Sequence, residues 1–223
     1  VKMSGIAITD HDTVEGLKEI EFLQKQHRNL KIVPGIEIGS YWNDCDIHIL
    51  GYNINHYLHW LHDYLHSLQG SRIERVEKIL SKLNNLGYKI NFSDVLAEKE
   101  KNSGSIGRPH VAKALVRKGY FSDTKEVFSS LLEAGKPAYV PRKKITPFEA
   151  IEIVLNAGGV PVLAHPGLSL KHNHEVVIEL IKKGLLGIEV YYPLHSMETI
   201  EFYKDIAERH DLIITGGSDF HGY

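Results

Sequence analysis

Short apolar runs rich in isoleucine and valine, each ending in a polar cluster, constrain the fold of this chain more than any other feature. Runs of this length fit buried β-strands, and unpaired polar side chains inside them would cost free energy, so the polar residues mark the strand ends. Helical patterns separate most runs, an order typical of a mainly parallel sheet, open or closed into a barrel. The runs occupy residues 5–8, 31–33, 36–38, 46–51, 159–163, 187–191 and 212–215.

The polar clusters after these strands are rich in metal ligands. Thr9-Asp10-His11-Asp12 follows the first strand, Ala164-His165-Pro166-Gly167 follows the run at 159–163, and Ser218-Asp219-Phe220-His221 follows the last. In α/β folds the loops at the carboxyl ends of strands converge on one face, so residues remote in sequence meet there. Adding one residue from each of two further strands gives a set of four His, one Glu and one Asp. The set is His11, Glu37, His48, His165, Asp219 and His221.

Each motif taken alone also has a structural explanation. Asp12 and Glu15 fit a helix cap, and the turn at His165 fits a polar connection at a strand end. Isolated side chains such as Glu37 and His48 are usually solvated or satisfied within the fold.

The joint set favours a catalytic metal site. Nitrogen and oxygen ligands without thiolate suit Zn, Mn or Fe(II), and six of them exceed what one tetrahedral ion needs, which favours a multinuclear site. Asp10 and Asp12 are then expected to orient His11 from outside the ligand set.

The middle of the chain lacks strand alternation. We expect a mostly helical insertion at residues 57–139 between two parts of a barrel domain, 1–56 and 140–223. A leucine stripe is expected on one helix, and a second helix is expected to begin at Ser71 as N-cap. Histidines 56, 59, 62 and 66 flank that stripe, and we interpret them as an ordinary helix face because no Glu follows the first His as in the helical zinc-protease signature.

Phosphate recognition has candidates within the insertion. Gly107 and Arg108 open a helix, where free backbone N–H groups, the positive dipole end and a guanidinium suit a phosphate; an ordinary helix start with a solvated Arg explains them equally well. Arg72 and Arg75 share a helix face, and surface ion pairing explains them equally well. His110 and His195 are possible proton donors to a leaving oxygen, and the sequence does not decide between them.

Composition excludes several classes of protein. The 223 residues carry a formal charge of −2 with pI near 6.7. Proteins that bind duplex DNA usually have an excess of basic residues, so we expect no duplex DNA partner. No run of 18 apolar residues or signal pattern occurs, so we expect no membrane partner. Cys45 is the only cysteine, which fits a reducing compartment, and we expect a cytoplasmic protein.

The ordered motifs together resemble the PHP (polymerase and histidinol phosphatase) family, most closely its TrpH/YciV-like branch. The resemblance covers nearly the whole chain, and the set is specific although each motif is short. It rests on Thr9-Asp10-His11-Asp12-Thr13, Pro34-Gly35-Ile36-Glu37, His48, Gly107-Arg108-Pro109-His110, Ala164-His165-Pro166 and Gly217-Ser218-Asp219-Phe220-His221.

The resemblance implies an α/β fold, a distorted (β/α)7 TIM-like barrel with a helical insertion. It also implies two to three divalent ions (Mn, Fe or Zn) and hydrolysis of a phosphate ester by metal-bound hydroxide. The implied substrates are nucleoside 3′,5′-bisphosphates and the 5′ ends of short RNA. The six residues of the set would be metal ligands, and Gly107 and Arg108, with Arg72 and Arg75, would hold substrate phosphate.

Members of the family also open with an Asp-x-His-x-His strand and a Ser-Asp-Gly turn, which the printed sequence does not contain. We therefore expect further ligands upstream of Val1. Two alternatives stay open. One is a histidinol-phosphate phosphatase, and the other is a non-catalytic metal- or nucleotide-binding module if the first motif is truly absent.

Overall fold

The chain forms two compact units, which the computed structural model describes over residues 3–43, 45–99, 106–141, 145–170 and 173–220. The first unit joins Val1–Asp63 to Lys144–Tyr223 and is called the sheet unit. The second unit, Tyr64–Lys143, is called the helical unit.

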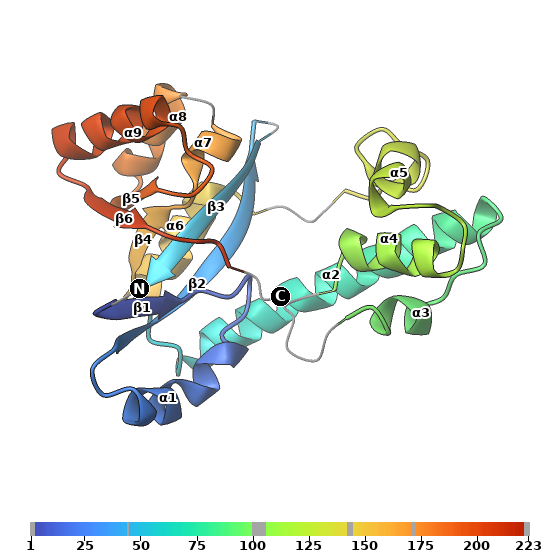
Figure 1. The fold of residues 1–223 in the computed structure, drawn as a ribbon, viewed down its shortest axis with the longest axis horizontal. Helices are drawn as coiled ribbons and strands as arrows, with labels where there is room; N and C mark the ends of the chain where they lie inside the picture. The colour runs from blue at the N-terminus through green and yellow to red at the C-terminus, as the bar shows by residue number, and fades with distance from the viewer. Residues whose placement is uncertain (1–2, 44, 100–105, 142–144, 171–172, 221–223) are drawn as a thin grey trace. The chain divides into compact units, whose positions relative to one another are not determined.

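A mixed sheet of six strands, curled into a half-barrel, forms the centre of the sheet unit (Figure 1). The strands lie in chain order across the sheet, and the pairs β1–β2, β4–β5 and β5–β6 are parallel while β2–β3 and β3–β4 are antiparallel. The expected α/β class is confirmed. The central antiparallel part differs from a parallel pattern because only two residues join β2 to β3, too few for a crossover. The strands are β1 (Gly5–Ile8), β2 (Lys31–Trp42), β3 (Cys45–Tyr52), β4 (Val160–Leu163), β5 (Gly187–Tyr191) and β6 (Ile213–Gly216).

Strand β2 continues through Pro34-Gly35, so the two runs that the sequence suggested as separate strands, 31–33 and 36–38, belong to one strand. The strand changes partner at this point, since β1 pairs with it up to Pro34 and β3 pairs with it from Gly35 onward. Proline has no N–H to donate, so its place at the end of one ladder is favourable. A side chain at Gly35 would collide with Thr9 and the carbonyl of Gly51, so glycine allows the close approach.

Helices cover the sheet. Helix α6 packs against β2, β3 and β4, and α9 packs against β5 and β6. Thr146 and Glu149 form a capping box at the start of α6: the Thr146 hydroxyl accepts from the Glu149 N–H at 3.2 Å, and the Glu149 carboxylate accepts from the Thr146 N–H at 2.6 Å. The helices of this unit are η1 (Glu15–Glu19), α1 (Ile20–Gln26), α6 (Pro147–Asn156), α7 (Pro166–Ser169), α8 (His174–Lys182) and α9 (Met197–Arg209).

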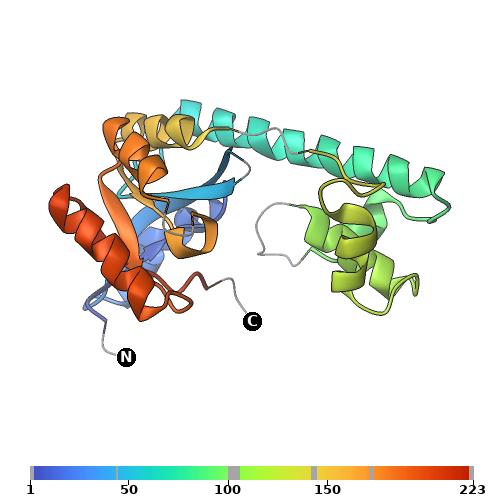
Figure 2. The ribbon, with the colours of Figure 1, turned by 90° about the horizontal axis from the view of Figure 1, so that it is seen from above.

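The helical unit has a hydrophobic core of its own, built from buried residues such as Val76, Leu83 and Leu115. Helix α2 is one unbroken helix (Figure 2), so the predicted second start at Ser71 was wrong. The Ser71 hydroxyl instead donates to the Leu68 carbonyl at 2.7 Å. Among the described helices, none has the length and apolar content that a membrane crossing needs. The elements that lie mostly or wholly in this unit are α2 (His59–Asn85), α3 (Phe92–Leu96), α4 (Arg108–Arg117), α5 (Thr124–Val127) and η2 (Phe128–Leu132).

Candidate metal centre

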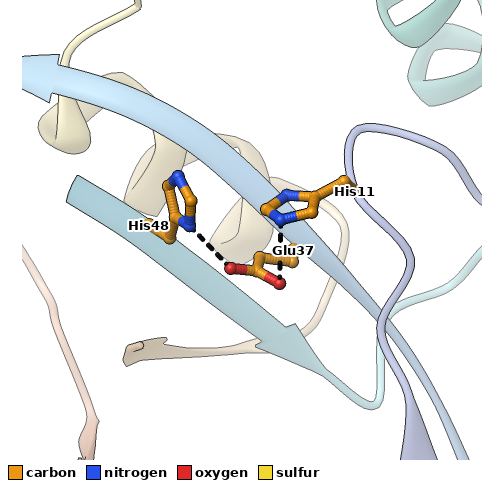
Figure 3. A group of neighbouring side chains, drawn as sticks. All are labelled: His11, Glu37 and His48. Atoms are coloured by element: carbon orange, nitrogen blue, oxygen red, sulfur yellow. Dashed lines mark hydrogen bonds and ion pairs between the residues drawn. The ribbon is translucent and has the colours of Figure 1, made fainter. Parts of the chain in front are cut away.

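The carboxylate of Glu37 lies at the centre of a cluster of histidine rings, two of which are drawn in Figure 3. Its Oε1 is 2.8 Å from Nδ1 of His48 and 3.2 Å from Nε2 of His165, and its Oε2 is 3.5 Å from Nε2 of His11. The Glu37 side chain is buried. Histidines from β3 and from the segments after β1 and β4 therefore meet at one carboxylate of β2. Glu37 and His48 lie within their strands, whereas the sequence pattern placed the site residues at strand ends.

Backbone hydrogen bonds that extend the sheet fix the side chains of this cluster. The segment after β1 continues to pair with β2, since the Asp12 N–H donates to the Glu37 carbonyl at 2.9 Å and the Glu37 N–H donates to the Asp10 carbonyl at 3.1 Å. The segment after β4 continues along β3 through Ala164, whose N–H donates to the His48 carbonyl at 3.0 Å. His11 and His165 thus lie at extensions of the sheet, and Glu37 and His48 lie within its strands.

Three residues at these strand ends adopt backbone conformations that L-amino acids rarely occupy. Asp12, His165 and Asp219 have φ angles of 51°, 28° and 50°. Such conformations cost about 1–3 kcal/mol each, and they persist where the surrounding structure holds them. The Asp12 carboxylate, which is fully buried, accepts from the Gly39 N–H at 3.1 Å. Helix η1 has Val14 as its N-cap residue, so the alternative explanation of Asp12 as a helix cap was wrong.

The histidines and carboxylates form two overlapping donor sets. His11, Glu37 and His48 make one set, and Glu37, His165 and Asp219 make the other; in each, the donor atoms lie within 4.8 Å of one another. Among the described residues these are the only such groups, and neither includes the histidines at 56, 59, 62 and 66. Glu37 is common to both sets: its Oε1 lies near His48 of the first set and His165 of the second, and its Oε2 lies near His11 of the first.

The chemistry of the donors fits divalent metal. All are imidazole nitrogens or carboxylate oxygens, which suit Zn, Mn or Fe(II). Nδ1 of His165 is buried and has no hydrogen-bond partner in the part of the chain that the structure describes. A buried polar atom without a partner is costly, so an atom of this kind indicates a position where a bound group is accommodated.

Burial and mutual charge shift the protonation of the cluster. Burial alone would raise the pKa of Glu37, but hydrogen bonds from His165 and His48, with the charge of His11, hold it well below its usual range. Burial alone would lower the pKa of His165, but its hydrogen bond to Glu37 and the nearby carboxylates raise it. The side chain of Glu37 is therefore ionised at neutral pH and carries the negative charge that a cation site needs.

Two residues that the sequence did not predict support the second donor set. Tyr192 is buried, and its hydroxyl donates to Oδ2 of Asp219 at 3.0 Å. Burial, together with that hydrogen bond, raises the pKa of Tyr192 to about 12, so the tyrosine stays a hydrogen-bond donor. Glu189 of β5 is also buried, and its Oε2 accepts from the His165 N–H at 2.9 Å.

Glu189 contacts the loops on both sides of its strand. Its hydrogen bond holds the turn after β4, and its Oε1 lies where a side chain at Gly217, after β6, would stand. Burial raises the pKa of Glu189, partly offset by the hydrogen bond from His165. The signal in the sequence was a lone carboxylate inside the apolar strand 187–191, where an unpaired charge would be costly.

The other predicted site residues lie in different surroundings. Both ring nitrogens of buried His195 are engaged: Nδ1 lies 2.9 Å from the Val190 carbonyl and Nε2 accepts from the Gly167 N–H at 3.1 Å. In the helical unit, Nδ1 of His110 accepts from the Gly107 N–H at 3.2 Å. Both histidines thus contribute to local structure, and their role as proton donors stays a prediction. His221 lies outside the described residues.

The predicted arginines make contacts within the helical unit. Arg108 donates to the Leu132 carbonyl at 3.0 Å, and its guanidinium lies 5.8 Å from the Phe128 ring centroid. Arg75 donates to the Val140 carbonyl at 2.8 Å. Binding of phosphate by these arginines stays a prediction.

Comparisons with known proteins identify the relatives of this chain. One relative is the 3′,5′-nucleoside bisphosphate phosphatase of Chromobacterium violaceum. The two sequences are 31% identical over 219 residues, which cover 97% of this chain and 76% of the relative. Another relative is the 5′-3′ exoribonuclease Rnm of Escherichia coli. The two sequences are 31% identical over an alignment of 227 residues, which covers 99% of this chain and 76% of the relative.

A solved structure agrees with these relatives. A protein of Bifidobacterium adolescentis, described as a candidate metal-dependent phosphoesterase, superposes with a TM-score of 0.81 at 32% identity, over 98% of this chain and 78% of that one. No family model matches the sequence. Identity and coverage of this extent, with the site geometry above, show that the chain belongs to the PHP-type, metal-dependent phosphoesterases related to 3′,5′-bisphosphate phosphatase and the Rnm exoribonuclease.

Proposed function

We propose that this protein hydrolyses a phosphate monoester of a small nucleotide, a nucleoside 3′,5′-bisphosphate, or acts at the 5′ end of RNA. The observation that carries the proposal is the pair of donor sets sharing Glu37. The names of the two relatives given above describe enzymes that act on these two kinds of substrate. Each relative aligns with at least 97% of this chain.

We propose that His11, Glu37, His48, His165 and Asp219, with His221, hold two to three divalent ions. When bound, such ions polarise phosphoryl oxygens and lower the pKa of water. Glu37, ionised and buried between the two sets, supplies the negative charge that attracts the cations. Tyr192 holds Asp219, and the strained turn at His165 is anchored by Glu189.

We also propose that the half-barrel belongs to the distorted seven-stranded barrel that the PHP resemblance implies. The barrel domain would comprise residues 1–56 and 140–223, and the insertion residues 57–139. Gly107 and Arg108, with Arg72 and Arg75, are proposed to hold substrate phosphate, because a guanidinium matches phosphate geometry and the start of α4 offers backbone N–H groups.

Phosphate release and metal content, measured on the same samples, test the proposal. We expect release of inorganic phosphate from a nucleoside 3′,5′-bisphosphate, loss of release after chelation, and recovery on adding Mn. The variant His165→Ala should lose both metal and turnover, and unchanged turnover in that variant would contradict the assignment. Faster turnover of histidinol phosphate would support the alternative substrate, and bound metal without any turnover would support a non-catalytic module.

A further inference from the structure

The turn after β4, which carries His165, is held through three consecutive main-chain groups. The His165 N–H donates to Oε2 of Glu189 at 2.9 Å, and the Gly167 N–H donates to Nε2 of His195 at 3.1 Å. The carbonyl of the proline between them accepts from the Tyr203 hydroxyl at 3.3 Å. All three side chains that make these contacts are buried. They are called the turn clamp: Glu189, His195 and Tyr203.

The backbone of this turn requires such support. His165 has a φ of 28°, a conformation that L-amino acids rarely adopt and that persists where the surrounding structure holds it. The clamp comes from β5, from α9 and from the loop between them, so these later segments fix the turn from outside. The clamp therefore determines where the His165 side chain is held.

The two nitrogens of the His195 ring have different partners, and these partners define its tautomer. Nδ1 lies 2.9 Å from the carbonyl of Val190, and a carbonyl can only accept, so Nδ1 carries the proton. Nε2 accepts from the Gly167 N–H, so it carries none. The ring thus joins the end of β5 to the start of α7, and its one N–H proton is already donated within the fold.

Close packing shows that the ring and the turn fit each other. A Cβ atom at Gly167 would lie 2.7 Å from Cδ2 and 2.9 Å from Nε2 of His195, and 2.6 Å from Cγ2 of Thr199. These distances are shorter than van der Waals contact, so a side chain at this position would displace the ring. Glycine at position 167 is therefore what allows the hydrogen bond to form.

The same histidine also lies behind Asp219. The ring of Tyr192 is 5.2 Å from the ring of His195 and 5.4 Å from that of His165, measured between centroids. The Tyr192 hydroxyl donates to Asp219 at 3.0 Å, and the His195 N–H donates to the Tyr192 carbonyl at 3.0 Å. His195 thus supports two members of the donor set that Glu37 completes.

The other donor set is positioned by a different part of the sheet. His48 belongs to β3, which pairs with β2, and the segment that carries His11 continues the pairing of β1 with β2 as a bridge from His11 to Glu37. Loss of the clamp should therefore affect the two sets unequally.

We propose that His195 is a positioning residue for the donor set Glu37, His165 and Asp219, and that it acts through the Gly167 N–H and the ring of Tyr192. The inference rests on the proposed function, in which this set holds metal. It replaces the possible role of His195 as a proton donor to substrate, because the Val190 carbonyl takes the ring proton.

Metal binding by full-length variants tests the inference. His195→Ala should weaken Mn binding at this set about 10–100-fold, while the ion at His11 and His48 stays bound. Elemental analysis after gel filtration should then find fewer ions than in the wild type, and electron paramagnetic resonance should show the hyperfine lines of an isolated Mn ion. His195→Gln, whose amide oxygen can take the place of Nε2, should restore binding, whereas His195→Asn, which is one bond shorter, should not.

Two further variants separate positioning from stability. Gly167→Ala keeps the histidine but displaces its ring, so it should weaken the same set. Ile153→Ala removes buried side-chain volume from α6 and should lower the melting temperature without loss of an ion. The inference is overturned if His195→Ala binds Mn as the wild type does, if the Gln and Asn variants bind equally, or if Ile153→Ala loses the same ion.

Phosphate release from the 3′,5′-bisphosphate is measured on the same samples. A wild type that releases phosphate, with unchanged metal binding in His195→Ala, would contradict this inference alone. The expected loss of metal in the variant, with no release by the metal-loaded wild type, would contradict the proposed function alone.

Discussion

The sheet unit and the helical unit carry formal charges of opposite sign. Residues 64–143 contain 15 Lys and Arg against 8 Asp and Glu, and the rest of the chain contains 11 against 20. In the sheet unit, with a formal charge of −9, the buried carboxylate of Glu37 faces histidines and is shared by two groups of side chains that could hold cations. In the helical unit, with a formal charge of +7, the exposed Lys78 and Lys82 and the half-buried Arg72 and Arg75 lie along one flank of α2. Buried charge is costly unless paired, so it marks a specific site, whereas exposed charge costs little and attracts polyanions over a surface. The comparison predicts that the two units respond differently to mutation.

The largest effect is expected at the shared carboxylate. Glu37→Gln removes the negative charge that both donor sets use, so turnover of the 3′,5′-bisphosphate should fall more than about a hundredfold. Steady-state assays on metal-supplemented protein measure the loss. Glu152→Gln, an exposed glutamate on α6 of the same unit, is the control and should retain activity. Equal activity of the two variants would break the comparison.

The next effect concerns the residue that anchors the His165 turn. Glu189→Ala leaves the His165 N–H without its acceptor and should weaken metal binding about 10–100-fold. Glu189→Gln keeps an acceptor oxygen and should restore most of the affinity. Metal titration followed by competition with a chelator measures both variants, with the exposed Glu201→Ala as control. If Glu189→Gln binds metal as weakly as Glu189→Ala, the hydrogen bond to the His165 N–H does not support metal binding.

Metal affinity should also depend on pH. The raised pKa of His165 means that the metal-free site keeps its proton above the usual histidine value of 6.5, and that proton stabilises the metal-free fold only below the raised pKa. An ion must displace the proton, so metal affinity should rise up to about tenfold per pH unit until His165 is deprotonated. Isothermal titration across pH 6 to 8, in several buffers, counts the released protons. Affinity that is flat over about this range would contradict the direction of the shift.

The smallest effects are expected at two helix caps, one in each unit. Thr146 caps α6 in the sheet unit and Asn91 caps α3 in the helical unit, where its side chain accepts from the Asp94 N–H at 2.9 Å. Replacing either by Ala should lower the free energy of unfolding by about 1 kcal/mol and leave turnover unchanged. Urea unfolding monitored by circular dichroism measures this. If the units unfold in separate transitions, each variant should shift only one of them.

The site could be predicted from the sequence where chemistry and strand periodicity coincide. His11 and His165 lie just after apolar runs. The change from apolar to polar residues marks the end of a buried strand in the sequence, so these two positions could be identified. Glu189 was missed because a single carboxylate inside a strand shows no sign of its partner, which is a backbone N–H remote in sequence. Tyr192 was missed as a support for Asp219 because its hydrogen bond depends on how two loops pack.

The fold was less predictable where tertiary contacts override local signals. Pro34-Gly35 usually marks a turn, but here the strand passes through it by changing partner. Ser71 usually marks a helix start, but here its hydroxyl returns to the Leu68 carbonyl inside α2. The charge partition between the units was visible in the sequence, and it became informative only once the unit boundaries at residues 63 and 144 were known.

The measurement that most directly tests the central claim is the number of metal ions bound by the wild-type protein and by Glu37→Gln. Elemental analysis after equilibration with excess Mn and gel filtration provides that number. The shared position of Glu37 predicts at least two ions in the wild type and a loss from both sets in the variant. An unchanged metal content in Glu37→Gln would contradict the claim that one carboxylate joins the two sets into a single metal centre.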